Sequence, residues 1–316
     1  MKAIFISSMV NTVYTAEQRQ KIAELTDLMP EIVDAKNFDS LDLSDVEVIF
    51  STWGMMCFTP EQLDRMPKLK AVFYAAGATD YFARPLLERG IRVFSAWLAN
   101  AVPVAEFTVA QIILSMKNYF NHTAALKCKE NWQRDKIGPG AYGETVALIG
   151  AGAISTKVQE LLKGYNLNVI VIPSRKERRT ISLEEAFRTA YVVSNHLPNR
   201  EDNQKVLTKE MFASMRPGAT FINTGRGAQV DEEGMCEVLK DRPDLTALLD
   251  VTCPEPPEND SPLYKLPNVH LSAHIAGSWN DEFHRMADYM IEEYNRYVAG
   301  EEPMYEITEK VLMTSN

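Results

Sequence analysis

The stretch VALIGAGAIS, residues 146–155, contains the arrangement that decides the fold of this chain. An apolar run ends directly before Gly150, Gly152 follows, and a helical pattern begins after it. Two glycines at such a turn let the backbone approach a pyrophosphate, and the N-terminus of the next helix offers unpaired N–H groups. The stretch therefore predicts a dinucleotide site. Ser155 replaces the third glycine of the usual G-x-G-x-x-G pattern, so we expect looser packing of helix on strand.

The next predicted strand ends in VIVIPSRKERR, where a dinucleotide-binding fold usually places an acidic residue for the adenosine ribose. Pro173 stands at the position of that residue, and Ser174 and Arg175 follow it. Without a carboxylate nothing repels a 2′-phosphate, and Arg175 is suited to bind one. The cofactor is therefore NAD or NADP, with NADP slightly favoured. The alternative is a basic exposed loop that holds the cofactor less specifically.

Short β-branched runs alternate with helical patterns in both halves of the chain, for example KAIFI, VEVIF and LKAVFY in the first half and TVALIG, LNVIVI and ATFIN in the second. This alternation predicts an α/β fold with parallel sheets covered by helices. A length of 316 residues suits two domains. We expect a substrate-binding domain of residues 1–99 and 281–316, a dinucleotide-binding domain of residues 100–280, both Rossmann-like or flavodoxin-like, and a cleft between them.

One long apolar segment, NAVPVAEFTVAQIILSMKNYFNHTAALK at residues 100–127, separates these halves. The pattern predicts a single helix of about 25 residues with Pro103 in its first turn. A helix that is apolar on most sides is normally buried. We therefore expect it to pack between the domains or against a second subunit, and we predict a homodimer formed through this helix.

Composition argues against several classes of function. The net charge of −10 is spread along the chain, which disfavours nucleic-acid and membrane surfaces as partners. We find no apolar segment that approaches the roughly 20 residues of a membrane-spanning helix. The four cysteines lie far apart without metal-ligand spacing, so we expect neither a metal site nor a disulfide framework. A cytoplasmic location fits these features.

Three ionisable residues follow predicted strands of the second half, namely Arg226, Glu255 and His274. Ligands of open α/β sheets bind beyond the carboxyl ends of the strands, so all three can face one ligand. Each also has a simpler explanation. Arg226 fits a solvated surface turn, and Glu258 competes for the role of Glu255. His270 lies within a predicted strand and is more typical of a packed residue.

The segments NAVPVAEFT, LIGAGAIS, NHLPNRED, MRPGATFINTGRGAQVDEE and LLDVTCPEPPENDSPLYKLPNVHLSAHIAGS, in this order, resemble the D-isomer-specific 2-hydroxyacid dehydrogenase family. This family includes phosphoglycerate dehydrogenase and hydroxypyruvate reductase. The resemblance covers nearly the whole chain. It implies an oxidoreductase that transfers a hydride between a nicotinamide cofactor and a small-molecule 2-oxo acid or D-2-hydroxy acid.

The resemblance also implies roles for single residues. The family's arginine, which grips the substrate carboxylate, matches Arg226, and its acid–base pair matches His274 and Glu255. Backbone N–H groups of Ala76 and Gly77 match the loop that holds the same carboxylate. The family's cofactor contacts, with Ser174 and Arg175 added from the strand end described above, match Thr108, Gly150, Gly152, Ala153, Ile154, His196, Pro198, Thr224, Gly225 and Asp250.

Two further points stay open at this stage. The alternative function is a dinucleotide-sensing regulator, similar to the corepressor branch of the same superfamily, with little turnover. A set of large residues, Trp53, Met55, Met56, Tyr81 and Trp279, either lines a bulky apolar substrate pocket or belongs to an ordinary core. Hydroxyl groups in that region would instead suit a hydroxypyruvate-like substrate.

Overall fold

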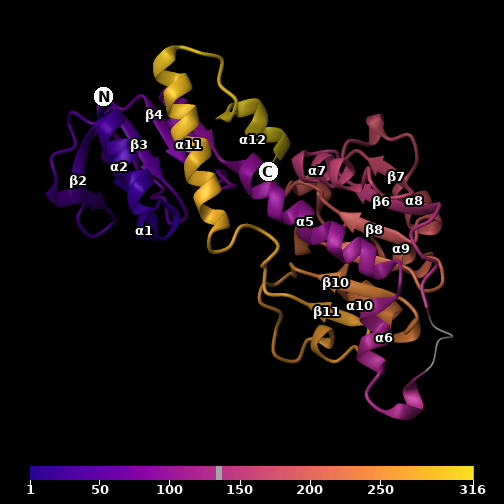
Figure 1. Cartoon of the computed structure of the whole chain (residues 1–316). Helices are drawn as coiled ribbons and strands as arrows, with labels where there is room; N and C mark the ends of the chain where they lie inside the picture. Colours follow the sequence, from indigo (N-terminus) through magenta and orange to yellow (C-terminus); the bar gives the residue numbers. More distant parts are fainter. Residues whose placement is uncertain (133–136, 316) are drawn as a thin grey trace. The chain divides into compact units, whose positions relative to one another are not determined.

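A computed structural model describes residues 1–132 and 137–315 of the chain, without the side chains of residues 313–315. The described residues fall into two compact units, one of Met1–Asn100 with Ser278–Thr314 and one of Ala101–Gly277. Each unit contains its own six-stranded sheet (Figure 1). The predicted α/β fold with parallel sheets is confirmed.

The first unit has the strand order β12-β5-β4-β3-β1-β2, parallel throughout except for β12, which pairs antiparallel with β5. Strands β3 and β4 are buried along their whole length, as expected for a parallel sheet with both faces covered. The elements of this unit are β1 (Lys2–Ile6), α1 (Val10–Val13), α2 (Ala16–Leu25), β2 (Asp27–Val33), β3 (Val48–Ser51), α3 (Pro60–Asp64), β4 (Ala71–Tyr74), α4 (Ala83–Glu88), β5 (Arg92–Ser95), α11 (Glu282–Ala299), β12 (Glu306–Ile307) and α12 (Glu309–Ser315).

Helix α11 brings the end of the chain back to the first unit. Figure 1 shows it, in yellow, beside α1 and α2. Its buried Tyr294 packs on Phe50 and Phe73 at ring-centroid distances of 5.3 and 5.4 Å. Near the start of the helix, Phe283 meets Trp53 edge-on at 5.1 Å. These aromatic contacts make α11 part of the core of the first unit.

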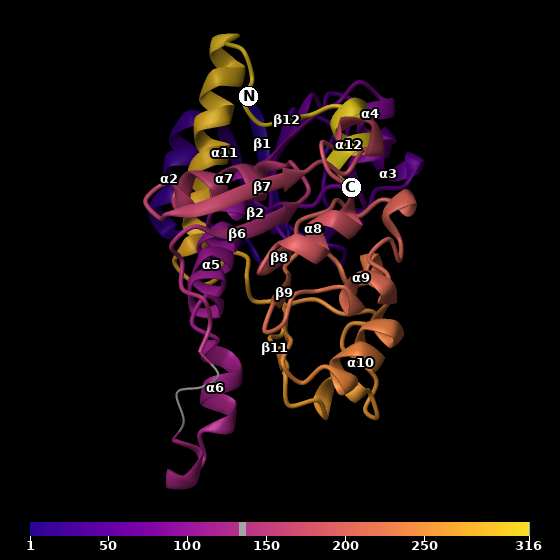
Figure 2. The same cartoon turned by 90° about the vertical axis from the view of Figure 1, so that its right-hand side faces the viewer.

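The second unit has the strand order β11-β10-β9-β8-β6-β7, parallel throughout. Helices α8, α9 and α10 run along one side of its sheet, with α5 on the other side (Figure 2). The elements that form this unit, of which α5 begins in the first unit, are α5 (Trp97–Ser115), α6 (Tyr119–Ala125), β6 (Glu144–Ile149), α7 (Ala153–Leu162), β7 (Leu167–Ile172), α8 (Leu183–Thr189), β8 (Val192–Asn195), α9 (Lys209–Ala213), β9 (Thr220–Asn223), α10 (Glu232–Asp241), β10 (Thr246–Leu249) and β11 (Val269–Leu271).

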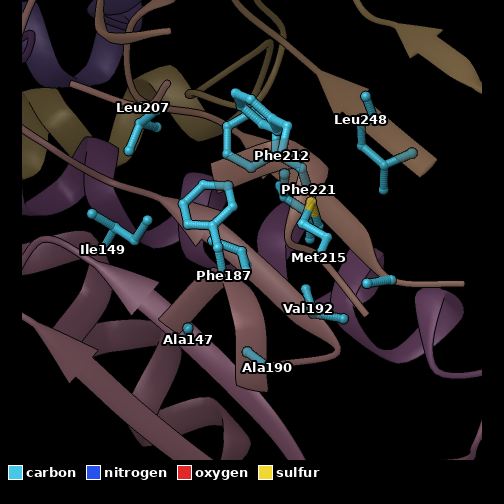
Figure 3. Packing of buried hydrophobic residues seen from close by; sticks show 14 of the residues in the cluster. Ala147, Ile149, Phe187, Ala190, Val192, Leu207, Phe212, Met215, Phe221 and Leu248 are labelled. Atoms are coloured by element: carbon cyan, nitrogen blue, oxygen red, sulfur yellow. The ribbon is translucent and has the colours of Figure 1, made fainter. Parts of the chain in front are cut away.

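The core of the second unit is built from aromatic and aliphatic side chains between the sheet and its helices (Figure 3). Phe212 on α9 lies edge-on to Phe187 on α8 and to Phe221 on β9, at ring-centroid distances of 5.3 and 5.0 Å. This arrangement is favourable for aromatic pairs beyond the area that they bury. It holds the helices rigidly on the sheet whose strand ends carry the candidate site.

Both sheets are doubly wound. In each one the chain passes from the first strand to the strand at the nearer edge, then reverses and adds the later strands towards the other edge. The reversal lies between β1 and β3 in the first unit and between β6 and β8 in the second. Ligands of such sheets bind beyond the carboxyl ends of the strands at this switch point. Each unit therefore has its own location where a ligand is expected.

The long apolar helix differs from its prediction, because it ends at Ser115 and a second helix, α6, begins at Tyr119. The carbonyl of Met116 accepts a hydrogen bond from the Gly140 N–H at 2.8 Å, so it is engaged outside the helix. Asn118 adopts a left-handed conformation with φ of 52°. Asparagine tolerates this conformation better than most residues, which allows the chain to turn here.

The expectation that no apolar segment approaches the length of a membrane-spanning helix was wrong for helix α5. With 19 residues it is long and apolar enough to cross a membrane by length and composition alone, and no other helix in the described part of the chain is. Core helices pass the same test. Ala105 and Ile112 of α5 are fully buried in the core of the second unit.

Candidate active site

The candidate catalytic residues Arg226, Glu255 and His274 all belong to the second unit. They follow β9, β10 and β11, which are neighbours in the sheet and parallel to one another. The carboxyl ends of parallel neighbours lie at the same edge of a sheet. The three loops therefore leave the sheet side by side.

His274 and Glu255 form a direct pair, with 2.6 Å between Nδ1 and Oε1. Their side chains are 50% and 42% exposed, so both can meet a ligand from solution. The other ring nitrogen, Nε2, has no partner among the described residues and is free to exchange a proton. Two carboxylates were considered from the sequence. The structure pairs Glu255 with the imidazole, whereas Glu258 is exposed and its side chain has no hydrogen bond or ion pair within the described residues.

The backbone of His274 is held in an uncommon conformation, with a positive φ of 54°. Its N–H donates to the carbonyl of Asp250 at 2.9 Å. The Asp250 carboxylate in turn accepts hydrogen bonds from the Ser272 hydroxyl at 2.6 Å and from the Ile275 and Ala276 N–H groups at 2.9 Å each. Asp250 therefore fixes the loop that carries His274. Its predicted contact with the cofactor stays a prediction; carboxylate oxygens can accept further bonds.

Arg226 is half-buried, and its Nη1 donates to the carbonyl of Gly225 at 2.8 Å. Within the described residues it forms no ion pair, although the chain carries an excess of negative charge. A guanidinium that is partly withdrawn from water and keeps free donors is suited to a carboxylate. The simpler explanation, a solvated arginine on a surface turn, does not fit this burial.

Three buried amide side chains that the sequence analysis missed hold the Arg226 loop. Asn195, at the end of β8, donates to the side-chain oxygens of Asn223 and Gln229 at 2.9 and 2.6 Å. Gln229 accepts from the Arg226 N–H at 3.2 Å and donates to the carbonyls of Leu197 and Pro198 at 2.8 and 2.9 Å. The available signal in the sequence was that the apolar strands YVVSN and ATFIN both end in asparagine.

A close contact between two loops explains why residue 227, one of the two glycines beside Arg226, is glycine. A Cβ atom at this position would lie 2.0 Å from the carbonyl carbon of Thr252, so only glycine lets the two loops touch. Glu232 binds the second loop as well, because its carboxylate accepts from the Cys253 N–H at 3.1 Å. Burial raises the pKa of Glu232, and this N–H opposes the rise. Gly227 thus allows a close approach by the protein's own backbone.

The predicted dinucleotide turn lies at the switch point of the second sheet. Gly150 has a φ of 106°, and a Cβ there would lie 2.4 Å from the His196 carbonyl oxygen, so the turn requires glycine. A Cβ at Gly152 would meet no described atom within 4 Å, which leaves space for a ligand. Helix α7 starts at Ala153 and Ile154 without a side-chain cap, so its first N–H groups are available to a phosphate. These residues fit a dinucleotide.

Further predicted cofactor residues form one buried chain of contacts. His196 lies with Nε2 at 2.9 Å from the Ser194 hydroxyl and Nδ1 at 3.4 Å from the Thr224 hydroxyl. The Thr108 hydroxyl of α5 is 3.4 Å from that of Thr224. Burial lowers the pKa of His196 to about 4, so the imidazole is neutral near pH 7. Pro198 contributes its carbonyl, which Gln229 binds.

The residues predicted to meet the adenosine end follow β7. The carbonyls of Pro173 and Ser174 accept hydrogen bonds from Arg179 at 2.9 and 2.7 Å, which fixes the loop backbone. Arg175 is exposed, and its guanidinium has no ion pair or hydrogen bond within the described residues. It is therefore available to an anion at this strand end.

The predicted substrate loop lies in the first unit, after β4. The Ala76 N–H donates to the carbonyl of Tyr74 at 2.9 Å, so it is already engaged. The Ser95 hydroxyl binds the carbonyls of Ala76 and Gly77 at 2.8 Å each. The Gly77 N–H has no partner among the described residues. Of the two predicted donors, Gly77 is the one that the structure leaves free.

The second unit combines a doubly wound sheet with a glycine turn at its switch point. It also carries a histidine–carboxylate pair and an unpaired arginine at neighbouring strand ends. Together these features are typical of the class of dinucleotide-binding oxidoreductases. The family model for the NAD-binding domain of D-isomer specific 2-hydroxyacid dehydrogenases matches residues 109–276. The chain belongs to this family.

Individual relatives agree with this assignment. The chain is 33% identical over 200 residues to D-3-phosphoglycerate dehydrogenase 2 of Arabidopsis thaliana, which covers 60% of this chain and 32% of the relative. It is 28% identical over 270 residues to D-3-phosphoglycerate dehydrogenase of Methanocaldococcus jannaschii, covering 82% and 51%. The chain thus spans only about a third to a half of the length of these relatives. Among solved structures, TT0316 protein from Thermus thermophilus matches with a TM-score of 0.74 and 25% identity, covering 98% of this chain and 100% of that one.

Proposed function

We propose that this chain is an NAD(P)-dependent dehydrogenase that interconverts a 2-oxo acid and a D-2-hydroxy acid. The observation that carries the proposal is the pair of His274 and Glu255, 2.6 Å apart, on loops beside that of the unpaired Arg226. All three residues lie in the unit that contains the family's NAD-binding domain. A regulator with little turnover has no need of an exposed acid–base pair.

In the proposed reaction, Arg226 binds the substrate carboxylate and polarises the neighbouring carbonyl. Charge-assisted hydrogen bonds of this kind contribute about 1.5–3 kcal/mol each. When bound, the nicotinamide supplies the hydride that reduces C2.

His274 provides the proton that the new alkoxide needs. Glu255 holds Nδ1 and so orients the ring, which leaves Nε2 available for the proton transfer. In the oxidative direction the neutral imidazole takes the proton back. The buried amides beneath Arg226 and the Asp250 contacts beneath His274 keep both groups in place, which is the main contribution of the protein to such chemistry.

We further propose NADP as the preferred cofactor, because Arg175 is exposed and unpaired where an acidic residue would reject the 2′-phosphate. The cytoplasm, where nicotinamide cofactors are plentiful, is the proposed location.

A homodimer is proposed through α5 and the segment after it. Among the described residues there, Leu114, Tyr119 and Trp132 expose 38%, 47% and 70% of their surface. Several large apolar side chains exposed along one segment favour a protein partner. Light scattering should give twice the chain mass, and Trp132→Ser together with Tyr119→Ser should shift the protein toward the monomer.

The test of the proposed activity follows nicotinamide absorbance with a panel of 2-oxo acids and with both cofactors. We expect oxidation of the reduced cofactor by the wild type. His274→Ala should lower kcat by about 10²- to 10⁴-fold, the usual contribution of a positioned acid–base group. Glu255→Gln should lower it less.

Two matched controls accompany these variants. His122→Ala and Glu258→Gln change the same residue types outside the pair and should keep wild-type activity. Cofactor binding, followed by fluorescence, should survive in all four variants. Tight cofactor binding without turnover on any acid of the panel would favour the regulator instead.

A further inference from the structure

The segment that carries Glu255 has few backbone groups by which the protein can hold it. Residues 253–257, which we call the Glu255 segment, read CPEPP, and proline has no backbone N–H. Only Cys253 and Glu255 therefore keep an N–H donor. Within the described residues the segment forms no hydrogen bond between backbone groups. Its position therefore depends on packing and on side chains that bind its backbone.

Apart from the neighbouring Thr252, two side chains bind the backbone of the Glu255 segment within the described residues. Glu232 accepts from the Cys253 N–H at 3.1 Å, and the Tyr264 hydroxyl donates to the carbonyl of Pro257 at 3.2 Å. Tyr264 is 54% exposed, so water competes for its bond, whereas Glu232 is partly buried. Glu232 is therefore the stronger of the two anchors.

Glu232 belongs to a stretch that contacts the β10 loop at two points. Gly227 packs directly on the backbone of Thr252, and Glu232 binds the residue after it. The same stretch begins with Arg226. The carboxylate of Glu232 thus connects the loop of the proposed substrate-binding arginine to the Glu255 segment.

A simpler role for Glu232 would be to stabilise α10, because it is the first residue of this helix. The side chain of Asp231 already caps the helix and accepts from the Gly234 N–H at 3.3 Å. Glu233, in the same turn, is exposed and offers its charge to the helix without leaving water. Burial raises the pKa of Glu232 and so disfavours its charged form, which the Cys253 N–H opposes. Helix stabilisation alone does not require this burial, whereas contact with the Glu255 segment does.

The bond at Cys253 lies two residues from the carboxylate that holds the imidazole. Pro254 stands between Cys253 and Glu255, and its ring fixes one backbone dihedral angle. Holding Cys253 therefore restricts where Glu255 can lie. The 2.6 Å contact of Glu255 with His274 depends on this restriction, because a hydrogen bond weakens steeply when its partners move apart or out of line.

We propose that Glu232 is a positioning residue for the acid–base pair: its carboxylate holds the start of the Glu255 segment, so that Glu255 stays in hydrogen-bond contact with His274. The inference rests on the proposed dehydrogenase function and adds a residue to it. Glu232 acts through Glu255 and takes no part in the proton transfer itself.

The first experiment separates the reach of Glu232 from its charge. Glu232→Gln keeps an oxygen at the same distance along the side chain and loses the charge, whereas Glu232→Asp keeps the charge one methylene short. We expect Glu232→Gln to retain kcat within about 3-fold, and Glu232→Asp and Glu232→Ala to lose about 10-fold, because the pair is displaced. KM for the cofactor should stay unchanged, since the glycine turn follows β6. Glu233→Ala, at the exposed neighbour, is the control and should keep wild-type kcat.

A greater loss in Glu232→Gln than in Glu232→Asp would show that charge matters and position does not, and would overturn the proposal. An equal loss in Glu233→Ala would do the same, because it would indicate a general effect on α10.

The second experiment asks whether Glu232 acts through Glu255. In a protein that already carries Glu255→Ala, adding Glu232→Ala should change kcat less than about 2-fold, because the group to be positioned is absent. Losses that multiply in the double variant would mean that Glu232 affects turnover by another route, and would contradict the proposal.

A third measurement does not depend on turnover. Hydrogen–deuterium exchange of the Cys253 amide, followed by mass spectrometry of peptides, should be faster in Glu232→Ala than in wild type and unchanged in Glu233→Ala. Unchanged exchange in Glu232→Ala would show that the carboxylate does not hold the segment. If wild type turned over no 2-oxo acid with either cofactor, the dehydrogenase function would fall, and the exchange rates would still decide whether Glu232 anchors the segment.

Discussion

At the scale of the residue, the buried imidazole of His196 links the dinucleotide site to the pH dependence of stability. Its two ring nitrogens face the hydroxyls of Ser194 and Thr224, and burial lowers its pKa to about 4. In the unfolded chain the same imidazole has its ordinary pKa of about 6.5. Between these two values the unfolded state binds a proton that the folded state does not. The stability that comes from keeping His196 neutral is therefore fully present above about pH 6.5, and it is lost as the pH falls from there through about 4.

From this difference we expect His196 to contribute a loss of about 3 kcal/mol in the free energy of unfolding between pH 7 and pH 4. His196→Asn, which keeps a polar side chain without the titration, should show a correspondingly flatter pH dependence in urea denaturation. His122→Asn, which replaces a partly buried histidine on α6, serves as the control. An identical pH slope in His196→Asn and wild type would show that other groups dominate acid unfolding.

At the scale of the element, the loops after β8, β9, β10 and β11 act as one connected structure. Asn195 and Gln229 join the β8 and β9 loops, and the contact of Gly227 with Thr252 joins the β9 and β10 loops. The His274 N–H then binds the Asp250 carbonyl, which joins the β10 and β11 loops. Catalytic side chains on separate loops keep their geometry only if such contacts hold the loops together.

Gln229→Leu tests this connection. The substitution leaves one N–H of the Asn195 amide, the N–H of Arg226 and the carbonyl of Leu197 without their partner, at a cost of about 1–3 kcal/mol for each unsatisfied group. We expect a lower melting temperature and a KM for the 2-oxo acid that rises about 10-fold or more, because Arg226 is no longer aimed. Gln204→Leu, at an exposed glutamine, is the control and should change neither value. A variant that loses stability but keeps its KM would assign the amides a purely structural role.

The loop after β7 supplies the second test at this scale. Arg175→Ala should weaken NADPH binding about 10-fold or more and change NADH binding little, because a charge-assisted contact to the 2′-phosphate contributes about 1.5–3 kcal/mol. Arg178→Ala removes the same charge three residues later in the loop and distinguishes a specific contact from the general field. Equal losses for the two cofactors, or for the two variants, would remove the argument for NADP.

The sequence predicted well that apolar runs form parallel strands and where many of these strands end. Gly150, Arg226 and His274 closely follow apolar runs, so their positions beyond the carboxyl ends of parallel strands were predicted without a structure. The amides Asn195 and Gln229 were missed because polar residues near strand ends usually face water, and their burial depends on which strands become neighbours. The end of α5 at Ser115 was missed for the same reason, since the Met116 carbonyl is bound by Gly140 from a distant part of the chain.

At the scale of the whole molecule, two cores share one chain that leaves the first unit after Asn100 and returns to it at Ser278. The first core depends on a segment from the end of the chain, because Tyr294 of α11 packs on Phe50 and Phe73 of β3 and β4. The second core is continuous in sequence. Within it Phe221 belongs to β9, the strand that precedes Arg226, and Phe212 of α9 packs on Phe221. A substitution that damages the first core should therefore affect cofactor binding less than one that damages the second core.

Tyr294→Ala and Phe212→Ala form a matched pair for this difference, since each removes a fully buried aromatic ring at a cost of about 3–5 kcal/mol. A dinucleotide at about 100 times its Kd stabilises the folded state of the unit that binds it by about 2.7 kcal/mol. We expect NADPH to remain bound to Tyr294→Ala, with a first unfolding transition that the cofactor does not shift, and to bind weakly to Phe212→Ala. Thermal unfolding with and without NADPH, followed by protein fluorescence and by bound-cofactor fluorescence, separates the two cases. A single transition that responds equally to both substitutions would mean that the two cores unfold as one cooperative structure, because each unit would then depend on the other for its stability.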